Sequence, residues 1–278
     1  MKKIAQGKVI IAGAGPGDAE LITLKAVRAL QRADVVLTDR LVSEEILSEH
    51  ISPLAKIIFV GKEGSNNAQS VSQKEINQML VEEAFQGKVV VRLKGGDVAF
   101  FSNVLDELNT LIEHNIPYEI IPGITAASGA SAYLGIPLTA RSHARGVRLL
   151  TYSHNTFSEN YWSELASTED TLVFYMSGEN WYELANQLIQ HNISNDKKIA
   201  IVQQATTPYQ KVFIHDFDEL KKNQPQENFV SPSLIIIGKV VQLHESFSWI
   251  ENSEADENYF RPASRKHIEI LNENKLSA

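Results

Sequence analysis

The stretch that decides the fold is Val9-Ile10-Ile11-Ala12-Gly13-Ala14-Gly15-Pro16-Gly17-Asp18, in which an apolar β-branched run breaks into a glycine turn. The same change recurs at Val89-Val90-Val91-Arg92-Leu93-Lys94-Gly95-Gly96-Asp97 and at Tyr118-Glu119-Ile120-Ile121-Pro122-Gly123. Glycine has no Cβ, so the backbone there can approach a ligand closely and adopt positive φ. Open α/β sheets bind ligands where their strands end. The three turns therefore predict a site built largely from main chain and suited to a nucleotide-like cofactor.

Composition limits the classes of protein to consider. The chain has 278 residues, is 43% hydrophobic and carries a net charge of −8. This length can bury a large core in one or two domains, and the acidic balance argues against broad nucleic-acid binding. The absence of cysteine excludes disulfides, thiolate metal sites and a cysteine nucleophile. No apolar run reaches the ~18 residues of a membrane span, and the N-terminus is not a signal peptide, so we expect a cytoplasmic protein without a membrane partner.

Strand-like and helix-like segments alternate through the first half of the chain. Strands are predicted at residues 8–12, 34–37, 57–60, 89–93 and 118–121, and helices at residues 21–30, 72–87 and 106–114. Ser72 and Glu75 have the spacing of a capping box, and Gly87 marks the end of that helix. Strands separated by helices predict a mostly parallel sheet.

The second half is again of α/β type, with more antiparallel character expected. Strands are predicted at residues 147–152, 171–176, 198–203, 211–215 and 233–238, and helices at residues 125–134 and 181–191. We expect an N-terminal α/β domain over residues 1–122, a C-terminal α/β domain over residues 123–245 and a polar extension over residues 246–278. For residues 264–276, a peripheral helix and disorder both remain open.

The first glycine turn partly fits a dinucleotide-binding fingerprint. Gly13 and Gly15 have the right spacing, and Asp39 lies about 20 residues further on, where a ribose-binding acid belongs. The third glycine position is Asp18, however, and Pro16 removes an N–H from the loop that would hold a pyrophosphate. An NAD site is therefore disfavoured.

Further motifs follow in order along the chain. They are Leu21-Ile22-Thr23-Leu24-Lys25-Ala26, Ala33-Asp34-Val35-Val36-Leu37-Thr38-Asp39-Arg40-Leu41, Val91-Arg92-Leu93-Lys94-Gly95-Gly96-Asp97, Pro122-Gly123-Ile124-Thr125-Ala126-Ala127-Ser128-Gly129, Gly135-Ile136-Pro137-Leu138-Thr139, Leu172-Val173-Phe174-Tyr175-Met176 and Pro232-Ser233-Leu234-Ile235-Ile236-Ile237-Gly238. With the first glycine turn, they resemble the uroporphyrinogen-III C-methyltransferase family of tetrapyrrole (class III) methyltransferases over residues 8–243. The resemblance implies two α/β domains with the cofactor cleft between them.

The same resemblance implies a function. Members methylate uroporphyrinogen III at C2 and C7 with S-adenosyl-L-methionine, leaving S-adenosyl-L-homocysteine and giving precorrin-2 through precorrin-1 for sirohaem and cobalamin. They are usually homodimers. Two alternatives stay open for this chain: a methyltransferase that acts on a later precorrin, and a cofactor-binding protein without turnover.

Roles for individual residues also follow from the resemblance. Asp39 matches the proposed proton acceptor and Lys62 the proposed proton donor. The matched cofactor-binding positions are Pro16, Gly95, Gly96, Asp97, Phe100, Thr125, Ala126, Met176 and Ala205. Taken alone, Asp39 fits a surface turn residue, Lys62 a solvated lysine and Met176 a core residue equally well.

An acidic tetrapyrrole needs charge-assisted arginine contacts. The candidates are Arg40, Arg92, Arg141, Arg145 and Arg148. The histidines, including His143 and His154, are too scattered to predict a metal site. Three segments depart from the family pattern, namely residues 63–69, 98–107 and 140–146. These loops line the tetrapyrrole in the family, so the sequence predicts the cofactor half of the site more firmly than the substrate half.

Overall fold

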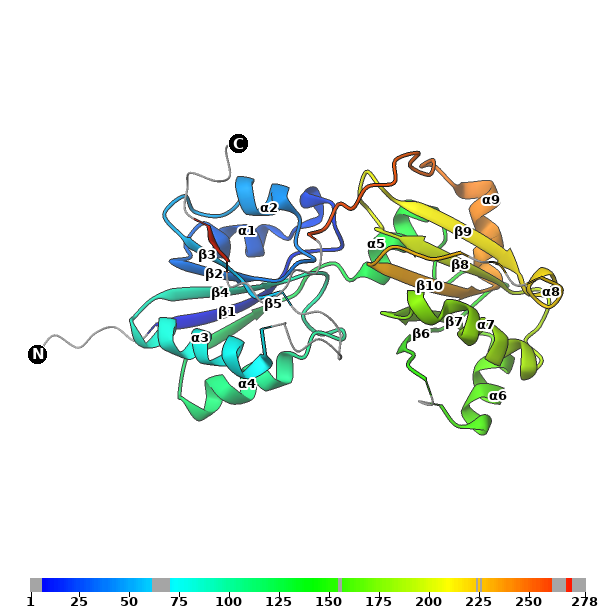
Figure 1. Ribbon diagram of the computed structural model, residues 1–278, viewed down its shortest axis with the longest axis horizontal. Coiled ribbons are helices and arrows are strands. Elements are labelled where there is room, and N and C mark those ends of the chain that lie inside the picture. The colour runs from blue at the N-terminus through cyan, green and yellow to red at the C-terminus, as the bar shows by residue number, and fades with distance from the viewer. Residues whose placement is uncertain are drawn as a thin grey trace, which may run out of the picture. The chain divides into compact units, whose positions relative to one another are not determined.

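The computed structural model describes residues 7–61, 71–154, 157–223, 225, 227–261 and 269–271. It divides the chain into two compact units, each with its own sheet (Figure 1). The first unit runs to Thr125 and resumes at Phe260, and the second is Ala126–Tyr259. Both are of α/β type, as the sequence predicts.

The first unit contains a six-stranded sheet in the order β11-β3-β2-β4-β1-β5. Its strands are β1 (Lys8–Gly13), β2 (Val35–Thr38), β3 (Lys56–Phe59), β4 (Val89–Lys94), β5 (Tyr118–Ile121) and β11 (Glu269–Leu271). The pairs among β1 to β5 are parallel, which confirms the mostly parallel sheet.

For residues 269–271 the structure has the short strand β11 in place of the expected helix or disorder, and the rest of the 264–276 segment lies outside the described residues. The strand pairs antiparallel with β3, with Ile270 opposite Ile58. Without it, β3 would be an edge strand whose unpaired N–H and C=O groups could template pairing with other chains. Local sequence could not reveal this strand, because its partner lies at the other end of the chain.

Helices cover both faces of this sheet (Figure 1). They are α1 (Leu24–Leu30), α2 (Glu44–Glu49), α3 (Gln73–Phe85) and α4 (Val104–Glu113), with a short 3₁₀ helix η1 (Ala19–Leu21). α1 and α2 pack with one apolar cluster, and α3 and α4 with another on the opposite face. The predicted capping box is confirmed: the Ser72 hydroxyl accepts from Glu75 N–H, and the Glu75 carboxylate accepts from Ser72 N–H. The helix expected from residue 21 begins at Leu24, since Thr23 is its N-cap.

The second unit contains a five-stranded sheet in the order β6-β7-β10-β8-β9. Its strands are β6 (Val147–Thr151), β7 (Thr171–Tyr175), β8 (Lys198–Gln203), β9 (Lys211–Asp216) and β10 (Ser233–Gly238). β6 and β7 are parallel, and the other pairs are antiparallel, as expected.

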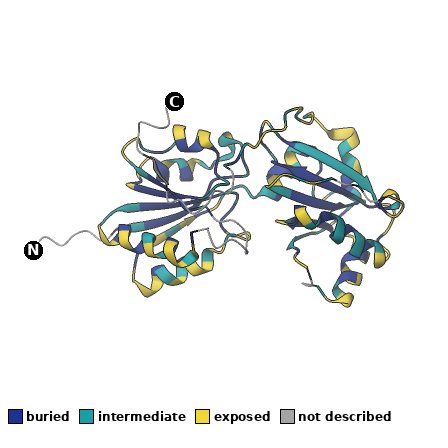
Figure 2. Cartoon of the chain, viewed as in Figure 1, coloured by how far each residue is buried: buried dark blue, intermediate teal, exposed yellow. Residues whose placement is uncertain are grey.

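Two apolar clusters also sandwich the second sheet, so its central strands β7, β8 and β10 are largely buried, whereas the edge strands β6 and β9 are only partly buried (Figure 2). One cluster contains residues of α6 (Glu159–Ser167), α7 (Trp181–Gln190) and α8 (Phe217–Leu220). The other contains residues of α5 (Ala126–Leu134) and the 3₁₀ helix η3 (Lys239–Leu243). The remaining elements are η2 (Gly178–Asn180) and α9 (His244–Phe247). In the described ranges, no helix is long and apolar enough to cross a membrane.

Candidate active site

The three glycine turns of the first unit meet in space. They follow β1, β4 and β5, which are neighbours in the sheet. Gly15 and Gly96 exchange backbone hydrogen bonds of 3.1 and 2.7 Å. A Cβ on Gly123 would lie 2.3 Å from the Gly96 carbonyl oxygen, and one on Gly13 would lie 2.6 Å from the same atom. The close packing of these backbones therefore requires glycine, and the three turns lie together at one edge of the sheet.

Asp97 ties two of these turns together. Its Oδ1 accepts from the Ala99 N–H at 2.7 Å, and its Oδ2 accepts from the Gly123 N–H at 2.7 Å. The side chain is buried. Asp97 therefore holds the backbone that follows β4 against the backbone that follows β5. Only the lone pairs of its two oxygens that these bonds leave unused could accept from a ligand.

Asp39 lies just after β2, at the same edge of the sheet. Its Oδ1 accepts from the Leu41 N–H at 3.1 Å, and its Oδ2 lies 3.9 Å from Arg92 Nη2. The Asp39 side chain is 22% exposed, whereas that of Arg92 is only 5% exposed. The carboxylate is thus oriented from the protein side and open on the other, as a proton acceptor must be.

A buried group of charges lies behind Asp39. Glu107 of α4 is fully buried, and its Oε1 accepts from Arg92 Nε at 3.1 Å and from Lys94 Nζ at 3.0 Å. The Arg92 Nη1 also donates to the carbonyls of Leu37 and Leu93. Burial and the neighbouring Arg92 lower the pKa of Lys94, and Glu107 partly opposes this. Buried charges persist only when paired, so this group holds a fixed arrangement beneath the site.

From the sequence, Arg92 is a candidate for binding the acidic substrate. In the structure, its side chain instead makes contacts inside the protein. Its guanidinium is committed to Glu107 and to backbone carbonyls. Lys94 and Glu107 are not among the candidate site residues predicted from the sequence. A usable signal existed in the charges that interrupt the β-branched run Val89-Val90-Val91-Arg92-Leu93-Lys94, because a buried strand must pair any charge that it carries.

The loop after Asp97 carries Phe100, whose side chain is partly exposed. Phe101 and Asn103 have φ of 53° and 54°. This loop lacks the glycines of the family pattern, yet it adopts the left-handed conformations that glycine would favour. A bulky residue in that region is strained, and such strain concentrates at functional sites. Pro16 and Thr125, the other cofactor candidates of this unit, are both partly exposed.

Strained residues also mark the second unit. Met176 follows β7 with φ of 54° and a 70% exposed side chain, which excludes the core-packing alternative. Gln204 and Thr206 follow β8 with φ of 47° and 67° and flank Ala205. Ala126 begins α5, and the Tyr175 hydroxyl accepts from the next N–H, that of Ala127, at 3.1 Å. The predicted positions of this unit therefore lie at strand exits and at one helix start.

The structure gives less support to a site role for the other residues predicted from the sequence. Lys62 lies outside the described residues. Arg148 pairs with Glu164 and Asp170, and Arg141 and Arg145 are exposed. His154 bonds Glu183 at 2.6 Å. Among the described residues, no group of three His, Cys, Asp or Glu side chains could hold a metal ion.

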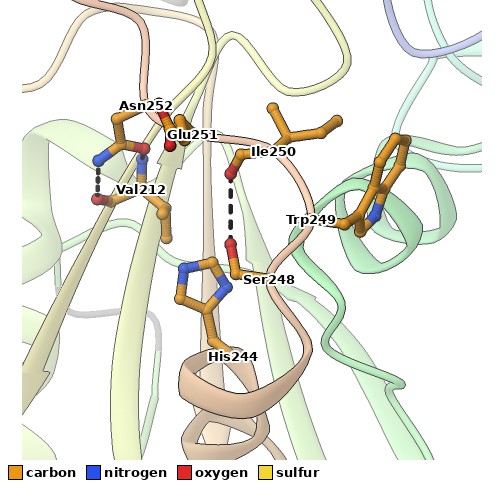
Figure 3. Close-up of a pocket in the computed structure, with 7 residues that line it drawn as sticks. All are labelled: Val212, His244, Ser248, Trp249, Ile250, Glu251 and Asn252. Carbon is orange, nitrogen blue, oxygen red and sulfur yellow. Dashed lines mark hydrogen bonds between the residues drawn. The ribbon is translucent and has the colours of Figure 1, made fainter.

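The second unit also has a surface pocket. Figure 3 shows its lining, which comprises Val212, His244, Ser248, Trp249, Ile250, Glu251 and Asn252. None of the predicted site residues is among them. This pocket therefore gives no support to the predicted cofactor positions.

Comparison with known proteins places this arrangement in a class. Residues 8–221 match the family Tetrapyrrole (Corrin/Porphyrin) Methylases. The chain belongs to this family. It is 46% identical over 249 residues to siroheme synthase 2 of Yersinia enterocolitica, covering 90% of this chain and 52% of that protein. It is also 46% identical over 246 residues to the siroheme synthase of Vesicomyosocius okutanii, covering 88% and 52%. The chain thus spans about half the length of these relatives.

Solved structures agree with this assignment. Uroporphyrin III C-methyl transferase from Thermus thermophilus is 33% identical with a TM-score of 0.71, and the match covers 85% of this chain and 100% of that one. The same enzyme complexed with S-adenyl homocysteine gives 32% identity and a TM-score of 0.70, covering 85% and 100%. A cobalt precorrin-4 methyltransferase is 26% identical with a TM-score of 0.73, covering 84% and 95%.

Proposed function

We propose that this chain methylates uroporphyrinogen III at C2 and C7, giving precorrin-2 through precorrin-1, with S-adenosyl-L-methionine as methyl donor. The observation that carries the proposal is the match to the Thermus uroporphyrin III C-methyl transferase, which covers that whole enzyme at 33% identity. Its complex with S-adenyl homocysteine supports the same cofactor here.

In this proposal, Asp39 is the proton acceptor. S-adenosyl-L-methionine would supply an electrophilic methyl group on a sulfonium. A ring carbon of the substrate would attack that methyl group in line, the sulfur–carbon bond would break to leave S-adenosyl-L-homocysteine, and a proton would then leave another position of the macrocycle. Asp39 suits this role because its carboxylate is oriented by the Leu41 N–H and partly exposed. Lys62 is proposed as the proton donor.

Cofactor binding is assigned to strand exits in both units. In the first unit these are Pro16, Gly95, Gly96, Asp97, Phe100 and Thr125, and in the second unit Ala126, Met176 and Ala205. Gly95 supports the assignment, because a Cβ there would lie 2.7 Å from the Leu41 Cβ, so the position requires glycine, and its backbone is only partly buried. Met176 offers a soft, exposed apolar surface that suits an adenine ring.

A later precorrin remains the second candidate substrate. The fold match to a cobalt precorrin-4 methyltransferase has a TM-score of 0.73, as high as the matches to the Thermus enzyme. The altered loop over residues 98–107 supports a changed substrate, since Ser102, Val104 and Leu105 stand where the family has glycines and the neighbouring Phe100 and Phe101 are exposed.

The proposal is tested anaerobically with enzymatically generated uroporphyrinogen III and S-adenosyl-L-methionine. Appearance of the dimethylated product by absorbance and mass spectrometry is the expected result. Unchanged substrate, together with proven binding of S-adenosyl-L-homocysteine, would leave a cofactor-binding protein without turnover. Turnover of a later precorrin alone would establish the second candidate.

Location and assembly are further parts of the proposal. A cytoplasmic location is supported by the absence of cysteine, which suits a reducing compartment. A homodimer is supported by the family resemblance, and light scattering of the purified chain tests it.

A further inference from the structure

The polar C-terminal extension makes an ordered set of contacts in the second unit. Residues 252–259 lie along the edge formed by β9 and the turn that precedes it. The Asn252 amide imitates a neighbouring strand: its Oδ1 accepts from the Val212 N–H at 2.7 Å, and its Nδ2 donates to the Val212 carbonyl at 2.9 Å (Figure 3). The Ser253 N–H then donates to the Gln210 carbonyl at 3.0 Å.

Gln204 binds the end of this segment. Its Nε2 donates to the Glu257 carbonyl at 2.8 Å, and its Oε1 accepts from the Tyr259 N–H at 2.7 Å. The residue is buried. Its own N–H donates to the Pro232 carbonyl at 2.9 Å. Gln204 is therefore fixed through its backbone on one side and through its side chain on the other.

These contacts act on a strained turn. Residues 204–210 include Ala205, which stands between two non-glycine residues of positive φ, Gln204 and Thr206. The Thr206 N–H donates to Gln210 Oε1 at 2.8 Å. Left-handed conformations of non-glycine residues are strained and persist only where surrounding contacts impose them. The bonds from residues 252–259 supply part of that constraint.

We infer that Gln204, clamped by residues 252–259, is a positioning residue that holds the Ala205 turn in the conformation that binds S-adenosyl-L-methionine. The inference rests on the proposed function, because Ala205 is a cofactor position only under that proposal. If only a fraction of the molecules has the turn in the conformation that binds the cofactor, the apparent dissociation constant equals the intrinsic constant divided by that fraction. Residues 252–259 would thus hold the Ala205 turn in its cofactor-binding conformation without contacting the cofactor themselves.

Two variants of the full chain test the inference from opposite sides. Gln204→Met keeps the side-chain length but removes both hydrogen bonds. Tyr259→Pro removes the N–H that donates to Gln204, together with the ring contact to Tyr209, and changes no residue of the turn itself. The matched control is Asp256→Ala, which removes only the ion pair with Lys211 within the same segment. Circular dichroism confirms that each variant is folded.

Calorimetry with S-adenosyl-L-homocysteine is the deciding measurement. Loss of one or two hydrogen bonds is expected to raise Kd about tenfold in Gln204→Met and Tyr259→Pro, and Asp256→Ala should bind as the wild type does. In turnover, KM for S-adenosyl-L-methionine should rise while kcat at saturation stays close to wild type.

Wild-type affinity in both variants overturns the inference, and so does an equal loss in Asp256→Ala. A wild-type chain that fails to bind S-adenosyl-L-homocysteine instead refutes the proposed function. The two failures are therefore distinguishable.

Discussion

Asp39 owes its proposed role to its position at the end of β2. The Leu41 N–H and the Arg92 guanidinium approach its two oxygens from the protein side. Asn retains the shape and one acceptor oxygen but cannot take up a proton. The residue can therefore be tested without disturbing the turn in which it lies.

We expect Asp39→Asn to lower turnover by about 10²–10⁴-fold, the usual contribution of a general base, and to change S-adenosyl-L-homocysteine affinity little. Steady-state kinetics and calorimetry measure the two effects. Asp34→Asn, at the opposite end of the same strand, is the control and should retain turnover, because its oxygen can still accept from the Val89 N–H. Equal losses of turnover and affinity would contradict the assignment.

The charge of Glu107 stabilises the folded protein, because it neutralises the buried Arg92 and Lys94. Glu107→Gln would leave Arg92 and Lys94 buried with their main counter-charge removed. Breaking a buried ion pair costs about 3–5 kcal/mol, so we expect a loss of that size in urea unfolding. Glu164→Gln is the control, because Glu164 is 56% exposed and pairs with Arg148, which is 30% exposed. Its cost should be about 1 kcal/mol or less. Similar losses in both variants would show that burial is not the cause.

At the scale of elements, ion pairs join neighbouring strands and helices of the first unit. Glu119 of β5 pairs with Lys25 of α1 and with Lys8 of β1. The hydrogen bonds from Lys25 and Lys8 lower the pKa of Glu119 to about 2. This one carboxylate therefore fastens the edge strand β5 to both of its neighbours.

This depressed pKa predicts a pH dependence of stability. The pKa of Glu119 is lower in the folded state, so its contribution is present above its ordinary value of 4.5 and is lost as the pH falls towards 2. We expect Glu119→Gln to be less stable than wild type at pH 7, with the difference shrinking between pH 4.5 and 3. Urea titrations across this range measure it. A difference that stays constant with pH, or that grows on acidification, would rule out the pairing as its source.

At the scale of the whole molecule, the chain passes from the first unit to the second at Thr125 and returns at Phe260. Phe260 is buried, the Arg261 guanidinium lies 3.7 Å from the centre of the Phe59 ring, and Arg261 pairs with Glu44. Phe260 and Arg261 are thus structural parts of the first unit.

Phe260→Ala should therefore lower the free energy of unfolding by about 3–5 kcal/mol, the usual cost of emptying a buried phenylalanine site. Chemical denaturation measures this cost, and amide exchange in β3 should become faster. Phe247→Ala is the control, because Phe247 is 60% exposed. A loss no greater than that of the control would mean that the terminal segment is dispensable.

Local signals predicted a large part of the fold. The capping box at Ser72, the β-branched runs and the glycine turns gave the main strands, the helix over α3 and the sheet types, because these patterns depend on neighbouring residues. α2 was missed, since six residues leave little periodicity. The candidate cofactor positions came from the family resemblance rather than from local chemistry.

The sequence by itself determined that three strands end in glycine turns, since the absence of a Cβ is a local property. Only the tertiary structure decided that these turns touch one another at Gly13, Gly96 and Gly123, because that contact depends on the strand order β4-β1-β5. It likewise decided that Glu107 lies against Arg92 and that Gln204 holds residues 252–259. Such pairings join residues distant in sequence, and no local pattern encodes their partners.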